Sequence, residues 1–202
     1  MIEKYSRQIQ ESEDIVEISD ILMGDPLFQD HLSRCADTPC DERIRTWCGL
    51  AGSARTAPAA FARKGDTIYL VGQTEPGIRA DGPDACPGDP ESAQVLAECI
   101  ARGLVTSIRA LSPDGLFVSL AESCAPGQLG FDITGDAEIP DKEFLFGPSR
   151  YLALVTVTEK QENALVDCLF NHRIPITLLG HVTKGELRMD EISFGYITDF
   201  TA

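Results

Sequence analysis

The chain has 202 residues, and its 32 acidic and 17 basic side chains give it a formal net charge of −15 at pH 7. Nucleic acids and anionic membrane surfaces would repel such a protein, so we expect neither as a partner. No apolar run is long enough to span a bilayer, and the polar, acidic N-terminus does not resemble a secretory signal. Seven irregularly spaced cysteines fit reduced, buried thiols better than a disulfide framework. Together these features predict a cytoplasmic protein.

The N-terminal part of the chain has the pattern of short helices followed by a flexible linker. Apolar residues recur at helical offsets over residues 3–22, and the triplet Gly24-Asp25-Pro26 then breaks the pattern. We expect a second helix around residues 27–32, a third over 40–47, and a linker of small residues over 51–60. Apolar faces left exposed on these helices would favour a homodimer.

Strand and helix patterns alternate after the linker. The runs TIYLVG (67–72) and YLALVTVT (151–158) are apolar and β-branched, which is typical of buried strands. The other strands are expected over 106–110, 131–133, 174–182 and 186–192, the last two as a hairpin around Lys184-Gly185, and the helices over 90–102, 116–124 and 159–172.

These elements predict an N-terminal helical segment with its linker, residues 1–57, followed by one domain, residues 58–202. The fold class of that domain is α/β (α+β), with a mixed β-sheet and helices packed against it. Its length is usual for a single domain.

A turn between a predicted strand and a predicted helix is the strongest functional signal. Ser112 to Gly115, SPDG, leads directly into the apolar helix that begins at Leu116. Backbone N–H groups at the start of a helix lie at the positive end of its dipole and can hold a phosphate or carboxylate. The same turn also suits a plain helix start, with Ser112 or Asp114 as the N-cap. Both interpretations stay open at this point.

The residues that suggest a metal or a nucleophile fit neither role well. His31, Cys35, Cys40 and Cys48 are separated by three, four and seven residues, which matches no paired zinc knuckle. We therefore predict no metal site and assign no catalytic residue.

Four passages, taken in order, resemble the C-terminal domain of the aminoimidazole ribonucleotide (AIR) synthase-related family. That family includes formylglycinamidine ribonucleotide synthase, selenophosphate synthetase and thiamine-monophosphate kinase. The four passages are most similar to those of formylglycinamidine ribonucleotide synthase. The resemblance covers roughly residues 58–202. The passages are KGDTIYLVGQT (64–74), ECIARGLVTSIRALSPDGLFVSLAE (98–122), FLFGPSRYLALVTV (144–157) and IPITLLGHVT (174–183).

The chain departs from the family pattern at the turn itself. Aligned on Gly115, it has Arg109-Ala110 where the family has His-Asp, and Pro113-Asp114 where the family has Asp-Gly. A slip of one residue would instead place Asp114-Gly115 on the family's Asp-Gly. Pro113 removes one N–H donor and Asp114 adds a negative charge, and both changes weaken anion binding unless Arg109 and Arg150 compensate.

The resemblance implies the substrate- and phosphate-facing half of an ATP-dependent amide-to-amidine ligase of purine biosynthesis. The implied ligand is a ribonucleotide phosphate, and the implied binding residues are Arg109, Ser112, Asp114, Gly115 and Arg150. ATP and Mg²⁺ are bound mainly by an N-terminal domain of the family, which nothing in residues 1–57 resembles. The resemblance therefore implies a partner chain that supplies this domain, and no ligase activity without it.

Two other functions remain open. The domain is a non-catalytic assembly or regulatory module if the altered turn has lost its site, with the N-terminal helices as the docking element. Alternatively, it is a phosphate- or nucleotide-binding protein that keeps the anion site without the chemistry.

Overall fold

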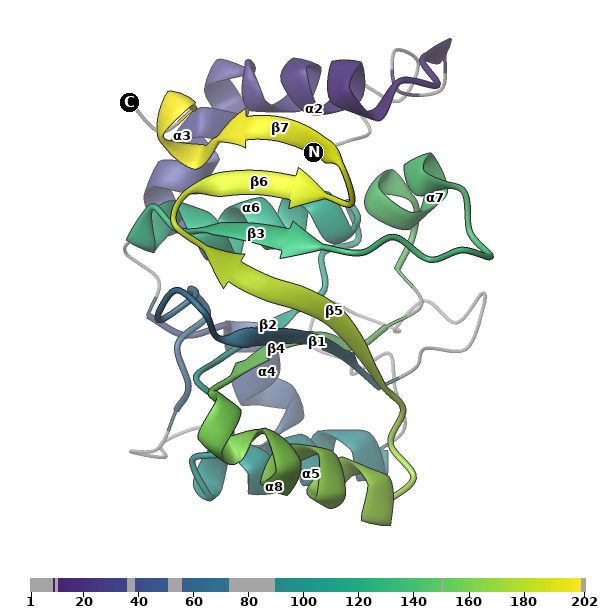
Figure 1. Cartoon of the computed structure of the whole chain (residues 1–202). Helices are drawn as coiled ribbons and strands as arrows, with labels where there is room; N and C mark the ends of the chain where they lie inside the picture. Colours follow the sequence, from purple (N-terminus) through teal and green to yellow (C-terminus); the bar gives the residue numbers. More distant parts are fainter. Residues whose placement is uncertain are drawn as a thin grey trace.

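A mixed sheet of seven strands forms the centre of the fold within the residues described, in the order β2-β4-β1-β5-β3-β6-β7 (Figure 1). The strands are β1 (Thr67–Val71), β2 (Ser107–Ala110), β3 (Gly130–Ile133), β4 (Ala153–Val157), β5 (Ile176–Thr183), β6 (Glu186–Met189) and β7 (Ile192–Tyr196). The structure is a computed structural model that describes residues 9, 11–35, 39–50, 56–72, 90–149 and 151–200.

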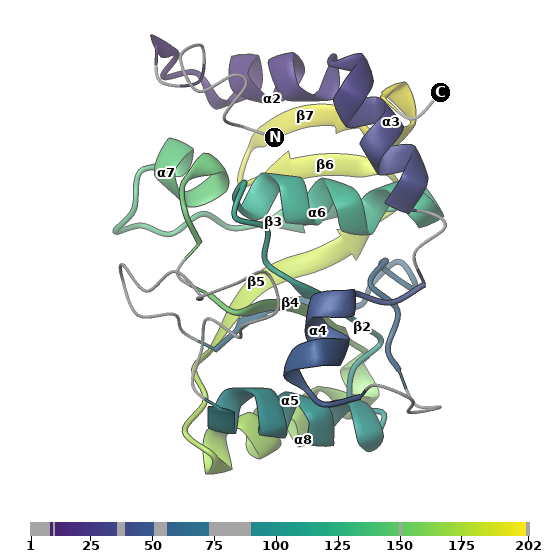
Figure 2. The same cartoon turned by 180° about the vertical axis from the view of Figure 1, so that it is seen from behind.

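Helices lie on both sides of the strongly twisted sheet, in two groups that Figures 1 and 2 show from opposite directions. One group is α5 (Pro90–Ala101) and α8 (Glu159–Asn171), and the other is α2 (Ile15–Met23), α3 (Pro26–Cys35) and α6 (Leu116–Cys124). The remaining helices are α4 (Glu42–Trp47), α7 (Asp141–Phe146) and the short 3₁₀ turns η2 (Ala125–Gly127) and η3 (Ile197–Asp199). This mixed arrangement confirms the predicted fold class.

Two hydrophobic cores meet at the central strands. Successive side chains of a strand point to opposite faces of its sheet. In β1, Ile68 and Leu70 join the core that contains α6, whereas Tyr69 and Val71 join the core that contains α5 and α8. A strand buried on both faces has to be apolar throughout, and this explains the unbroken run that predicted it.

The N-terminal helices are part of the first core. Ile15, Ile18 and Leu22 of α2, with Phe28 and Leu32 of α3, are buried in the cluster that contains α6. The apolar faces on which the homodimer expectation rests are therefore covered within the chain. Leu27 stays exposed on α3, and the homodimer remains a prediction.

Helix α2 also protects the β7 end of the sheet. It lies beside β7 in both views, and an uncovered edge strand would offer its backbone to other chains. Within the pattern over 3–22, residues 9 and 11 are helical and residues 12–14 are not. Helix α2 begins at Ile15, because Asp14 caps it by accepting hydrogen bonds from the N–H groups of Val16 and Glu17.

The predicted hairpin between residues 174–182 and 186–192 is wrong. Strand β5 pairs with β1 and β3, and β6 pairs in parallel with β3 and antiparallel with β7, so β3 lies between β5 and β6. The hairpin instead joins β6 to β7, with Asp190 in the left-handed region at φ 53°. Residues 186–192 thus form parts of two strands rather than one.

Gly130 at the start of β3 makes this arrangement possible. The turn from Thr183 to Glu186 crosses over the start of β3, and a Cβ on Gly130 would lie 2.0 Å from the carbonyl oxygen of Glu186 and 2.5 Å from Oγ1 of Thr183. Only glycine leaves room for two backbone segments to approach this closely.

Gly130→Ala is expected to lower the free energy of unfolding by about 3 kcal/mol, because the new Cβ forces the crossing turn to move. Gly127→Ala is the matched control, since its Cβ would find its nearest neighbours at an ordinary 3.5 Å. Urea unfolding of both variants measures the difference. Equal, small effects at the two positions would contradict the close crossing.

No described helix is both long enough and apolar enough to cross a membrane.

Candidate functional site

The Ser112–Gly115 turn uses its own backbone donors internally. The N–H of Ser112 donates to Oγ of Ser119 at 2.8 Å, and the N–H of Asp114 donates to Oγ of Ser112 at 3.1 Å. The N–H of Gly115 donates to the carbonyl oxygen of Ser112 at 3.1 Å, and Pro113 has no N–H. An anion at this turn would therefore have to displace hydrogen bonds that already exist.

Helix α7 closes over the same turn. Gly115 has φ 102°, and a Cβ on it would lie 2.8 Å from the carbonyl oxygen of Leu145 in α7. Sequence patterns did not predict α7, although Pro140 directly before it and the acidic residues Asp141 and Glu143 in its first turn are typical of a helix start. The turn and α7 thus form one packed unit.

A small pocket of about 20 Å³ lies between the turn and the segment that contains Arg150. Its walls include Leu116, directly after the turn, and Ser149 and Tyr151, which flank Arg150 in the chain. The structure therefore brings together two of the segments that sequence patterns selected. The pocket has room for about one water molecule. Arg150 itself and the loop 73–89 lie outside the described residues.

Arg109, the other expected phosphate partner, is bound to the far half of α6. Its side chain is buried, and Nη1 donates to Oε2 of Glu122 at 3.0 Å while Nε donates to Oγ of Ser123 at 2.9 Å. Nη2 also donates to the carbonyl oxygen of Glu122 at 3.3 Å. Glu122 lies six residues beyond Leu116, which is about 9 Å along a helix. A role for Arg109 in phosphate binding stays a prediction, and it would require this side chain to leave Glu122.

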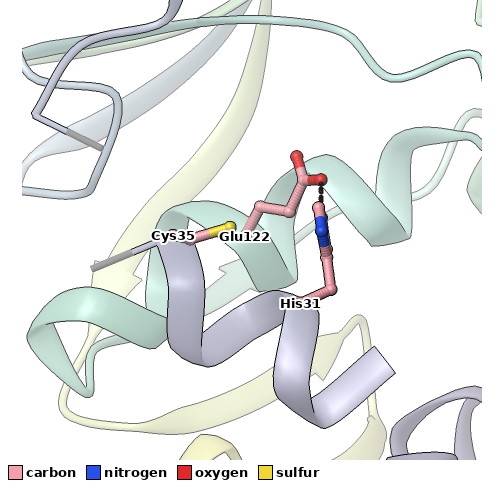
Figure 3. A group of neighbouring side chains, drawn as sticks. All are labelled: His31, Cys35 and Glu122. Carbon is pink, nitrogen blue, oxygen red and sulfur yellow. Dashed lines mark hydrogen bonds and ion pairs between the residues drawn. The ribbon is translucent and has the colours of Figure 1, made fainter. Parts of the chain in front are cut away.

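Glu122 connects Arg109 to the N-terminal helices. Its Oε1 accepts a hydrogen bond from Nε2 of His31 at 2.7 Å, and the thiol of Cys35 lies beside the pair (Figure 3). Burial, and next the negative charge of Glu122, raise the pKa of the Cys35 thiol, while the positive charge of Arg109 opposes this. Sequence patterns did not select Glu122, although a carboxylate within the apolar run LFVSLAESC needs a buried partner.

The residues around α4 bind the strand that leads into the turn. The N–H of Ala110 donates to Oδ2 of Asp41 at 3.1 Å. Arg43 donates to the carbonyl oxygens of Ala110 at 2.8 Å and Leu111 at 3.0 Å. Strand β2 lies at one end of the described sheet, so these contacts satisfy backbone groups that a neighbouring strand would otherwise pair. The N-terminal part of the chain therefore holds the β2–α6 unit from two directions.

A family model identifies the domain that carries this unit. Residues 63–190 match the model described as AIR synthase related protein, C-terminal domain. The chain belongs to the AIR synthase-related family. The resemblance inferred from the four sequence passages is thereby confirmed.

Among curated proteins, the chain is similar to the phosphoribosylformylglycinamidine synthase subunit PurL of several bacteria. It is 32% identical to PurL of Thermobifida fusca over 148 residues, which covers 65% of this chain and 19% of that protein. It is 29% identical to PurL of Carboxydothermus hydrogenoformans over 147 residues, which covers 65% of this chain and 20% of that protein. The chain thus spans about a fifth of the length of these relatives.

Solved structures of PurL from Thermotoga maritima share the fold. The structure described as complexed with ATP has a TM-score of 0.59 at 16% identity, covering 74% of this chain and 28% of that one. The structure described as complexed with FGAR has a TM-score of 0.58 at 16% identity, covering 72% of this chain and 29% of that one. At this level of identity the likeness concerns the fold alone.

Arg109→Met is expected to lower the free energy of unfolding by about 3–5 kcal/mol, because it leaves the carboxylate of Glu122 buried without its cation. Arg102→Met is the matched control: Arg102 forms a similar ion pair with Glu98 on α5, but both side chains are about half exposed. Water solvates Glu98 when its partner is removed, so thermal unfolding of the control should stay close to that of the parent. Equal shifts of the unfolding midpoint in the two variants would show that the buried ion pair matters no more for stability than the exposed one.

Proposed function

We propose that the chain forms the substrate-facing half of a phosphoribosylformylglycinamidine synthase-type ligase of purine biosynthesis. The observation that carries this proposal is the 32% identity with PurL over 148 residues, in a domain of the matching family and fold. Those residues cover 19% of the relative, so the proposal concerns only one part of such a ligase.

The reaction of such a ligase converts an amide to an amidine with ATP and ammonia. ATP supplies the phosphoryl group that turns the amide oxygen into a leaving group, and ammonia then displaces it. The described residues do not form a cradle for a triphosphate, because the N–H groups of the Ser112–Gly115 turn are engaged internally and Arg109 is bound to Glu122. ATP and Mg²⁺ would accordingly be bound by a partner chain that carries an N-terminal domain of this family.

In this proposal the chain itself forms one side of the ribonucleotide-binding site, which we call the substrate wall. Ser112, Asp114 and Gly115 lie at the start of α6, next to the pocket whose walls flank Arg150. The guanidinium of Arg150 would bind the phosphate, and the start of α6 would add its favourable dipole. Asp114 places a negative charge in the same turn, and this charge would weaken anion binding.

A second candidate function is a non-catalytic assembly module. The observation that favours it is the closed turn: all three of its N–H groups already have acceptors, and α7 packs on it. The His31 and Arg43 contacts to the β2–α6 unit would then serve to hold a docking surface in shape. In a third candidate, a nucleotide-binding protein, the chain would bind ATP without turnover.

Isothermal titration of the full chain with formylglycinamide ribonucleotide separates these functions. A substrate wall should give saturable binding that Arg150→Ala weakens by about tenfold, because one charge-assisted hydrogen bond is lost. Asp114→Asn should tighten binding, since it removes a like charge from the turn. Lys160→Ala is the matched control, because it removes one exposed positive charge at the start of α8, in the other group of helices.

Each other outcome has a definite meaning. No heat and no thermal stabilisation at millimolar ribonucleotide would contradict the substrate wall and favour the assembly module. Binding of ATP alone, unaffected by Asp114→Asn and Arg150→Ala, would favour the nucleotide-binding protein.

A further inference from the structure

Three side chains of metal-ligating type converge between α3 and α6. His31 and Cys35 are four residues apart on α3 and so share one face of that helix, and Glu122 reaches them from α6 (Figure 3). One ligand atom from each of the three lies within 4.8 Å of the other two. The sequence alone suggests four residues as metal ligands. The fold brings two of them, His31 and Cys35, together with a carboxylate from a distant part of the chain.

We propose that His31, Cys35 and Glu122 bind a zinc ion that fastens the N-terminal helix α3 to α6. Zinc is borderline-soft and is bound by thiolate sulfur, imidazole nitrogen and carboxylate oxygen, which is the donor set present here. Mg²⁺ and Ca²⁺ prefer oxygen ligands throughout, so this site discriminates against them.

The His31–Glu122 pair needs only a small adjustment to accept the ion. Two ligand atoms at ordinary zinc distances lie roughly 3.3 Å apart in a tetrahedral site. Nε2 of His31 and Oε1 of Glu122 are 2.7 Å apart, held by the hydrogen bond that the ion would replace. The His31 side chain is 32% exposed and can rotate to open this distance, and its exposure leaves access for water as the fourth ligand.

The carboxylate of Glu122 is already oriented for the ion. Arg109 donates to Oε2 of Glu122, so it holds the carboxylate in place and leaves Oε1 for the ion, as residues that hydrogen-bond to metal ligands commonly do. On binding, the Cys35 thiol releases its proton to solvent, and the resulting thiolate together with the Glu122 carboxylate balances the two charges of zinc. Arg109 stays hydrogen-bonded to Oε2 of Glu122 and does not contact the ion.

The zinc site is separate from the substrate wall proposed above. Glu122 lies in the second half of α6, whereas the Ser112–Gly115 turn precedes its first residue. The ion would replace the His31–Glu122 hydrogen bond with a coordination link between α3 and α6, two helices that also share an apolar contact within one core. Its consequence is structural: it stabilises the docked position of the N-terminal helices, and this does not depend on whether the turn binds a ribonucleotide.

Titration of the full-length chain with Co²⁺, a spectroscopic substitute for zinc, tests the proposal. One equivalent should produce a thiolate-to-cobalt charge-transfer band with tetrahedral d–d bands, and one equivalent of Zn²⁺ should abolish them. Cys35→Ser should remove the charge-transfer band, and His31→Gln should weaken binding by roughly tenfold or more. Cys40→Ser and Cys48→Ser are the matched controls, since both cysteines are partly buried in the same N-terminal part but lie outside the cluster.

Thermal unfolding supplies a second readout and guards against misfolded variants. Zn²⁺ should raise the unfolding midpoint of the parent and of both control variants, but not that of Cys35→Ser. Absence of a thiolate band in the parent, or a band that survives in folded Cys35→Ser, would overturn the proposal. A band lost in Cys40→Ser or Cys48→Ser would also overturn it, because the ligand would then be a different cysteine.

Discussion

The carboxylate of Glu122 is buried in a helix whose other side chains are almost all apolar or small, and it is stable there only because it has partners. Arg109 reaches it from β2 and His31 reaches it from α3, so one side chain joins a strand of the sheet, the helix that follows the turn and the N-terminal helices. A buried ion pair contributes little net stability when complete, but loss of one partner is costly. Consequently the relative placement of these three elements depends on Glu122 keeping both contacts.

The same contacts limit what the candidate site can do. Arg109 is one of the two expected phosphate partners, but its guanidinium binds the second half of α6 rather than the turn. The turn itself has internal acceptors for its N–H groups and is covered by α7. In the substrate-wall proposal, anion binding at this turn would accordingly need Arg150 and would have to displace the hydrogen bonds within the turn. This is why the substrate wall and the assembly module remain direct competitors, and why the charge of Asp114 is informative.

Local sequence patterns predicted most of the individual elements. The helix over 116–124 and the buried strand at 67–72 follow from apolar periodicity, because each is buried along most of its length. The position of β3 between β5 and β6 could not be predicted in this way. It depends on pairing between residues distant in sequence and on the room that Gly130 leaves for the crossing turn. Turn residues at 184–185 indicated a hairpin, but the same chemistry also serves a crossing over a third strand.

The site shows the same division between local and non-local information. Ser112, Asp114 and Gly115 could be assigned to one turn from the sequence, because they are close neighbours in the chain. The partner of Arg109 could not be inferred, because a basic residue before a turn suits a phosphate as well as a carboxylate thirteen residues later. Glu122 was likewise missed as a neighbour of His31 and Cys35, since 91 residues separate it from His31.

A double-mutant cycle on Arg109 and Glu122 tests most directly whether this pair organises the fold. Arg109→Met, Glu122→Gln and the double variant would be unfolded in urea beside the parent chain. We expect the double variant to be more stable than the sum of the two single losses implies, with a coupling free energy of about 2 kcal/mol or more. Additive losses would contradict this expectation and would show that Glu122 and Arg109 are stabilised independently of each other.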